Sequence, residues 1–192
     1  MKERFIVCEG LDGAGKTTII KEAIKKLDDS FIYIKGLKSN TFIGKIASKI
    51  PVTFTFLLEL AWNTKRKIKP ALKSNKIVFQ DRYDLSLLSY VPKVYRLYNK
   101  LLMNIFKKFL LKPDVLIYFT VSFDERIKRL EQNRNKYHSL LIKNPSLIKL
   151  REKKYLELYD NFDGIKFKID TKKKEIDETV DEFIAQLFKR IY

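Results

Sequence analysis

The sequence feature that most constrains the fold is a glycine-rich segment near the N-terminus, Gly10-Leu-Asp-Gly-Ala-Gly-Lys-Thr17. It matches the pattern of a phosphate-binding loop, in which a glycine and four further residues precede Gly-Lys-Thr. Glycines here let successive backbone N–H groups close around phosphate oxygens. The lysine, Lys16, can reach the β- and γ-phosphates, and the threonine hydroxyl can bind Mg²⁺. The segment therefore predicts a nucleoside triphosphate site with its magnesium ion.

The residues on either side of this loop support the match. Residues 4–9 contain an apolar run of strand length, and residues 16–27 carry apolar side chains at helical spacing. A strand, a glycine loop and a helix form the arrangement that the motif requires. The phosphates would then lie at a helix N-terminus, where free N–H groups and the helix dipole favour anions. A simple glycine turn, the alternative, would need neither Lys16 nor Thr17.

The rest of the chain alternates between strand-like and helical patterns. Strand-like runs occupy residues 4–9, 31–36, 77–80, 115–121 and 165–169. The longest helical patterns occupy 54–73 and 84–111, each of which could be broken, and further ones occupy 122–136, 145–161 and 175–190. This alternation predicts βαβ units whose right-handed crossovers place helices on both faces of a parallel sheet. We expect a three-layer α/β fold with a five-stranded parallel sheet, formed by one domain over residues 1–192. Its active site should lie at the carboxyl ends of the strands.

Residues 130–144 form the least regular part of the chain. The stretch is polar, separates two predicted helices and carries Arg134 and Lys136. Such a segment is typical of a short lid that closes over a phosphoryl-transfer site and excludes water. An ordinary surface connection is the alternative.

A second motif, Asp81-Arg82, follows the apolar run at 77–80. A carboxylate at the carboxyl end of a strand, in a chain with a phosphate-binding loop, is positioned to hold Mg²⁺ through its water shell. The neighbouring arginine offers a planar fork for a phosphate group. The two side chains could instead pair with each other.

The net charge of +17 limits the kinds of partner that the protein can be expected to bind. Nucleic acid, polyanionic small molecules and a merely lysine-rich surface are the three interpretations. The lysines are spread along the whole chain at helical spacing and form no dense tail, so solvated helix faces are favoured over a nucleic-acid interface. The charge would still attract nucleotides. The absence of any long apolar run and the single cysteine, Cys8, indicate a cytoplasmic protein without a membrane span or internal disulfide.

Beyond these motifs, the chain resembles the thymidylate kinase family of nucleoside monophosphate kinases. The opening at residues 5–18 is close to that of the family and includes Glu9 and Asp12, which generic phosphate-binding loops lack. Further matches are found at 68–72, 81–83, Ser86, Tyr90, 112–119, 151–158 and 170–171. The resemblance is intermittent but spans nearly the whole chain. It implies an ATP- and Mg²⁺-dependent kinase that converts dTMP to dTDP, and dimers packed through long helices.

The resemblance also implies roles for individual residues. Those expected to bind ATP phosphates are Gly10, Gly13, Ala14, Gly15, Lys16, Thr17 and Thr18, and those expected to hold the metal are Thr17 and Asp81. The acceptor nucleotide would meet Asp12 at its sugar, Arg82 at its phosphate, Phe56 at its base, and Lys35, Ser86 and Tyr90 nearby. Lys16 and Arg82 would assist catalysis.

Position 14 carries alanine, where some members of the family have a catalytic arginine. Members with a small residue there supply the arginine from the lid, and the corresponding residues here are Arg129 and Arg134. Arg126 would contact the adenine side. A solvated helix face is the alternative for Arg126 and Arg129.

The chain departs from the family where the acceptor is recognised. The family's Arg-Glu-Pro-Gly-Gly-Thr segment is replaced by residues 35–41, and Leu60 takes the position of its base-contacting arginine. A shifted register could bring Lys65 or Arg66 there instead. These departures keep open a kinase of another nucleotide, nucleoside or metabolite. A non-catalytic nucleotide- or nucleic-acid-binding protein is less favoured, because Lys16 and the Asp81-Arg82 motif are intact.

Overall fold

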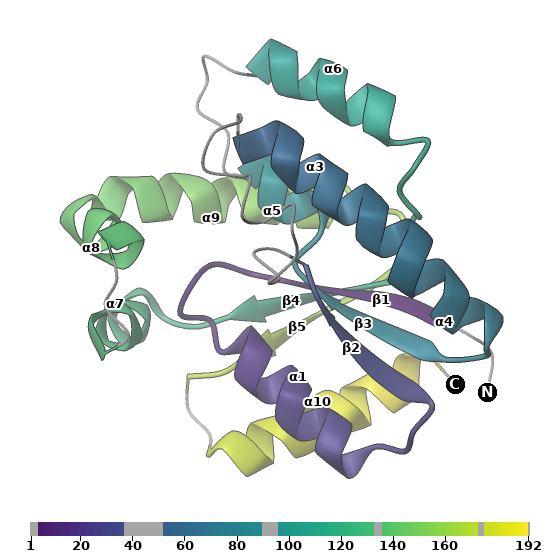
Figure 1. Ribbon diagram of the computed structural model, residues 1–192. Helices are drawn as coiled ribbons and strands as arrows, with labels where there is room; N and C mark the ends of the chain where they lie inside the picture. The colour runs from purple at the N-terminus through teal and green to yellow at the C-terminus, as the bar shows by residue number, and fades with distance from the viewer. Residues whose placement is uncertain (1–3, 37–51, 90–95, 133–135, 173–174, 192) are drawn as a thin grey trace.

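The computed structural model describes residues 4–36, 52–89, 96–132, 136–172 and 175–191. Its centre is a sheet of five parallel strands in the order β2-β3-β1-β4-β5 (Figure 1). The strands are β1 Arg4–Glu9, β2 Phe31–Lys35, β3 Ile77–Asp81, β4 Val115–Thr120 and β5 Ile165–Asp170. These bounds differ by one residue at most from the runs in the sequence, and the predicted fold class is confirmed.

Helices cover both faces of this sheet (Figure 1). On one face lie α1 Lys16–Lys26 and α10 Ile176–Ile191; on the other lie α3 Val52–Asn63, α5 Asp84–Ser89 and α9 Pro145–Asp160, with α6 Arg96–Phe106 outside α3. The alternation along β1 explains the layers, because Phe5 and Val7 belong to one buried cluster and Ile6 and Cys8 to the other. No helix among the described residues is long and apolar enough to cross a membrane.

Each of the two longest predicted helical stretches contains more than one helical element in the structure. The pattern at 54–73 is one helical run in which a π-helical turn, η1 Thr64–Ile68, joins α3 to α4 Lys69–Lys73. Pro70 in α4 lacks the N–H of a regular helix and its ring crowds the preceding turn, which explains a widened turn at this point. The pattern at 84–111 contains α5 and α6, and the residues between them, 90–95, lie outside the described residues.

The segment predicted to be least regular contains a helix that the sequence analysis missed. α7 Phe123–Gln132 and α8 Lys136–Lys143 lie beside the carboxyl edge of the sheet, before α9 begins (Figure 1). Leu141 of α8 is buried in the core that α9 shares with the sheet. An apolar contact to a distant part of the chain therefore stabilises an eight-residue helix that is too short to form by itself.

Candidate active site

The phosphate-binding loop joins the carboxyl end of β1 to α1, as predicted. Gly10, Gly13 and Gly15 have positive φ angles of 146°, 80° and 74°, which side chains disfavour. At Gly10, a Cβ atom would also lie 2.4 Å from the carbonyl oxygen of Phe119 in β4. Gly15 caps α1, so the free N–H groups of the helix begin at Lys16. This loop has the shape and polarity of an anion site.

Lys16 is folded back onto the loop that precedes it. Its ammonium donates hydrogen bonds to the carbonyl oxygens of Gly10 (2.8 Å) and Leu11 (3.1 Å). Only 5% of the residue is exposed. Burial, with a smaller contribution from the charge of Arg82, lowers the pKa of Lys16 to about 8. An anion next to the ammonium would reverse this shift, so the buried lysine is suited to a phosphate ligand.

Thr17 and Asp81 meet where β3 ends beside the loop. The Thr17 hydroxyl donates a hydrogen bond of 2.6 Å to Oδ2 of Asp81, and the Tyr33 hydroxyl from β2 donates to the same oxygen at 3.0 Å. Hydroxyl and carboxylate oxygens are ligands that Mg²⁺ prefers. Among the described residues no group of three His, Cys, Asp or Glu side chains could hold a metal. The pair therefore fits an ion that keeps water and phosphate oxygens as its other ligands.

Arg82, the residue after Asp81, bonds to Asp12 of the loop. The distance between Nη2 of Arg82 and Oδ1 of Asp12 is 2.5 Å, and Arg82 also reaches the Ser86 hydroxyl at 3.4 Å. The φ angle of Arg82 is 72°, a conformation that points its side chain out of the strand direction. Arg151 of α9 approaches the other Asp12 oxygen at 3.9 Å. The Asp12 carboxylate thus lies between two guanidinium groups.

A buried carboxylate, Glu9, organises the turn after Asp81-Arg82. It accepts hydrogen bonds from the backbone N–H groups of Tyr83 (2.8 Å) and Ser86 (3.0 Å) and from the Ser86 hydroxyl (2.5 Å). The Tyr155 hydroxyl of α9 adds a fourth at 3.2 Å. Burial nevertheless raises the pKa of Glu9. The sequence analysis assigned no role to Glu9, Arg151 or Tyr155; its only signal was that they fall in segments that resemble the family.

Arg129 lies against the turn that follows β5. Its guanidinium donates to the Thr171 hydroxyl (2.9 Å) and carbonyl (2.8 Å), and a weaker bond of 3.4 Å reaches the carbonyl of Gly13. Nε of Arg129 donates to Glu125 at 2.9 Å. The residues at 170–171 are those that resemble the family's adenine-side turn, so Arg129 is held on that side of the loop.

Arg126, predicted to contact the adenine side, is held beneath the loop by protein partners, and its contact with adenine stays a prediction. It is fully buried beneath Gly13, and its Nη2 donates to Glu152 of α9 (2.9 Å) and to the carbonyl of Val121 (3.2 Å). Burial lowers its pKa. A solvated helix face, the alternative for Arg126 and Arg129, does not describe either residue, because each bonds to its own partners around the loop.

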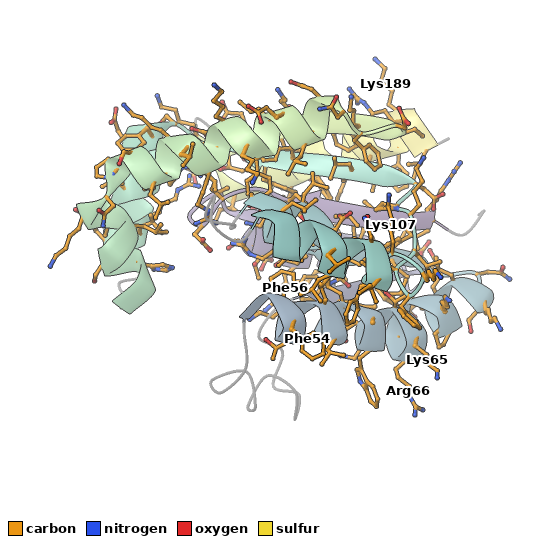
Figure 2. The ribbon with its side chains drawn as sticks, turned by 90° about the horizontal axis from the view of Figure 1, so that it is seen from above. Phe54, Phe56, Lys65, Arg66, Lys107 and Lys189 are labelled. Atoms are coloured by element: carbon orange, nitrogen blue, oxygen red, sulfur yellow. The ribbon has the colours of Figure 1, made fainter. Side chains whose placement is uncertain are left out.

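The residues predicted to contact the acceptor base lie on α3 and η1. Phe56 and Leu60 are buried in the core between α3 and the sheet. Lys65 and Arg66, on η1, are exposed and project outward from the helical run (Figure 2). Arg66 lies over the ring of Trp62, 5.0 Å from its centroid. Contact of either cation with the acceptor base stays a prediction.

Of the remaining predicted site residues, the structure describes Lys35 but not Tyr90 or Arg134. Lys35 ends β2 and is exposed, in register with Asp81 of β3. Tyr90 and Arg134 lie outside the described residues, as does most of the segment at 35–41. The structure thus brings together Asp12, Lys16, Thr17, Asp81, Arg82 and Ser86 at one edge of the sheet.

Comparisons with known proteins agree with this geometry. The model of the thymidylate kinase family matches residues 8–183. The probable thymidylate kinase of Methanocaldococcus jannaschii is 33% identical over 193 residues, with 95% of each chain covered. That of Sulfurisphaera tokodaii is 30% identical over 198 residues, covering 97% of this chain and 98% of the relative. A solved thymidylate kinase from Candida albicans, 21% identical, shares the fold with a TM-score of 0.74 over 98% of this chain and 92% of its own. By the extent of these matches, the chain belongs to the thymidylate kinase family.

Proposed function

We propose that this protein transfers the γ-phosphoryl group of ATP to dTMP, producing ADP and dTDP. The observation that carries the proposal is the meeting of two ligand sets at one loop. Lys16 and the Thr17–Asp81 pair form one set, and the Asp12–Arg82 pair forms the other. A donor and an acceptor phosphate bound to these two sets would lie close together at the loop.

Each side chain has a task that its chemistry supports. The loop from Gly10 to Thr18 would bind the phosphates of ATP, and Lys16 would exchange its carbonyl partners for phosphate oxygens. Thr17 and Asp81 would hold Mg²⁺, which when bound neutralises charge on the phosphates. Arg82 would bind the acceptor phosphate. That phosphate oxygen is already anionic at pH 7, so the transfer needs positioning and cations rather than a strong base.

The cations come from more than one element in this proposal. Ala14 is uncharged and cannot replace the catalytic arginine that some family members have at this position. We assign that role to Arg134, in a lid at 130–144. The lid would belong to a single domain of residues 1–192. Arg129 stays on the Thr171 side, near the adenine of ATP, where it steadies the loop through Gly13. Arg126 supports the loop from beneath.

An ADP-release assay with Mg-ATP and a panel of nucleoside monophosphates tests the proposal. We expect dTMP to give the highest kcat/KM, and Arg82→Gln to lower it about a hundredfold or more because it loses a charged phosphate contact. Lys67→Gln, an exposed change of equal charge on η1, is the matched control. No stimulation by any nucleoside monophosphate would overturn the proposal.

A second candidate function, a kinase for another nucleoside monophosphate, is favoured by one observation. Leu60 is buried and Lys65 and Arg66 project outward, and in this candidate function none of these three reads a base edge. A site without such a polar contact discriminates weakly between bases. The same assay separates the two candidates, because dTMP would then be no better than its competitors.

We also propose that the protein acts as a cytoplasmic homodimer. Leu101, Ile105 and Phe109 are spaced by four residues along and beyond α6, and they are 60%, 51% and 58% exposed. Of the other apolar residues in the stretch 84–111, Leu87 packs in the core of its own chain, and Val91 and Val94 lie outside the described residues. A second copy would cover the exposed apolar row.

A further inference from the structure

We infer that Tyr33 is a positioning residue for the metal-binding carboxylate of Asp81. The inference rests on the proposed function and deepens it, because it assigns part of the Mg²⁺ site to strand β2. Nothing in the motifs of the sequence points to Tyr33. It lies 48 residues before Asp81 and outside both the phosphate-binding loop and the Asp81-Arg82 motif.

The position of Tyr33 follows from the register of the sheet. Tyr33 is paired with Phe79 of β3, and Lys35 is paired with Asp81. Tyr33 and Asp81 are therefore two residues apart along neighbouring strands, on the same face of the sheet. A long, rigid phenol spans this diagonal, and its hydroxyl lies 3.0 Å from Oδ2 of Asp81.

Two hydroxyl groups hold one oxygen of this carboxylate. Thr17 donates to Oδ2 of Asp81 at 2.6 Å, and Tyr33 donates to the same atom from the other strand. A carboxylate with one oxygen fixed by two donors cannot rotate about its Cβ–Cγ bond without losing a hydrogen bond. In the proposed function the Thr17 hydroxyl also binds the metal, so its bond to Asp81 would be exchanged when the ion enters. Tyr33 belongs to strand β2 and has no such second partner in the proposal.

A cation from α1 packs on the ring of Tyr33. The ammonium of Lys21 lies over its ring, 5.8 Å from the centroid, and packs against the ring from α1. Such partners of a ligating carboxylate fix its orientation, and removing one typically costs about 10-fold to 100-fold in metal affinity.

The alternative is a structural role, in which the bond only ties the edge strand β2 to β3. The two roles predict different dependence on magnesium. A positioning role affects nucleotide binding only when the metal is present, whereas a structural role weakens binding of the nucleotide with and without metal, or affects stability alone.

The test is the affinity of ADP, measured by calorimetry with excess Mg²⁺ and again with EDTA, for the native protein and Tyr33→Phe. Tyr159→Phe is the matched control, because it removes a phenol hydroxyl from a ring packed on Tyr118, in α9 and away from Asp81. We expect Tyr33→Phe to lose about 10-fold or more of the gain in affinity that Mg²⁺ confers. Its affinity in EDTA, and both affinities of the control, should equal those of the native protein.

The inference is overturned if Tyr33→Phe keeps the full magnesium gain, or if it loses equal affinity in both conditions. Thermal unfolding of each variant identifies a variant that fails to fold, and Tyr33→Trp, which keeps an aromatic ring but moves its donor, then replaces Tyr33→Phe under the same criteria. If the native protein binds ADP with a magnesium gain but does not phosphorylate any nucleoside monophosphate, the proposed function fails while the inference stands.

Discussion

Replacing Lys16 by methionine should make the protein more stable in the absence of nucleotide, although it removes the lysine proposed to bind the phosphates. The reason is the burial of the ammonium, which is held by two carbonyl oxygens and repelled by Arg82. Methionine has a similar length and volume and carries no charge. Burial and Arg82 outweigh the attraction of Asp81, Asp12 and Glu9, and this net cost of the charge disappears with the substitution.

The structure gives the size of the effect. Burial and charge lower the pKa of Lys16 from 10.5 to about 8. At about 1.4 kcal/mol per unit, the folded protein disfavours the charged form by about 3 kcal/mol. Loss of the two hydrogen bonds to Gly10 and Leu11 offsets about half of this. We expect Lys16→Met to raise the free energy of unfolding by about 1–2 kcal/mol, and Tm by about 2–8 °C for a chain of this length.

Thermal and urea unfolding at pH 7 measure this change, and Lys67→Met is the control. Lys67 is exposed on η1, so Lys67→Met reduces the net charge equally without relieving a buried ammonium. The advantage of Lys16→Met should shrink as the pH rises. The folded pKa of Lys16 lies below its unfolded value, so the native protein gains stability between about pH 8 and pH 10.5. Added Mg-ADP should stabilise the native protein and leave Lys16→Met unchanged.

The reasoning is refuted if Lys16→Met is less stable than Lys67→Met at pH 7 without nucleotide. It is also refuted if the difference between the two variants does not change from pH 7 to pH 10. In either case the loop carbonyls would compensate the buried charge of Lys16 fully. Phosphate binding would then gain nothing from removing a cost of burying that charge.

Three other changes test the site and its surroundings. Glu9→Gln should lower the free energy of unfolding in urea by about 1–3 kcal/mol. Both oxygens of Glu9 accept hydrogen bonds, and the NH₂ group of glutamine cannot accept one, so a donor loses its partner. An unchanged unfolding midpoint would contradict this. Arg151→Gln should raise KM for dTMP about tenfold and leave ADP affinity unaltered, since Arg151 faces Asp12; an equal loss for both nucleotides would point to misfolding instead. Ile105→Glu should convert the proposed dimer to a monomer in light scattering, and a native protein that is already monomeric would exclude that interface.

The sequence predicts the donor half of this site because its residues are close in the chain. The loop from Gly10 to Thr17 and the helix after it form one local unit. The Asp81-Arg82 motif could be added because parallel strands bring their carboxyl ends to one edge. The positions of the strands could be predicted as well, because the alternation of apolar runs with helical patterns is compatible with few other folds.

The parts that could not be predicted depend on packing between distant segments. Glu9 bonds to Tyr155 over 146 positions, and Asp12 faces Arg151 of the same helix. Both contacts require α9 to cross the carboxyl edge of the sheet, which no local pattern specifies. Arg126 and Arg129 show a different limit. They lie three residues apart on α7, and helical periodicity alone does not decide which of them is buried beneath the loop and which reaches Thr171.

In the proposed function, both substrates would bind by taking over contacts that the protein now makes with itself. Lys16 is bonded to two carbonyl oxygens of its own loop, and Arg82 is bonded to Asp12. An ATP phosphate would take over the first cation and an acceptor phosphate the second. When Arg82 is taken over, the Asp12 carboxylate still has Arg151 at its other oxygen. Asp12 is then available to the acceptor's sugar only after the acceptor's phosphate has arrived. The order of these exchanges would favour a nucleoside monophosphate over an unphosphorylated nucleoside, because only the former releases Asp12 from Arg82.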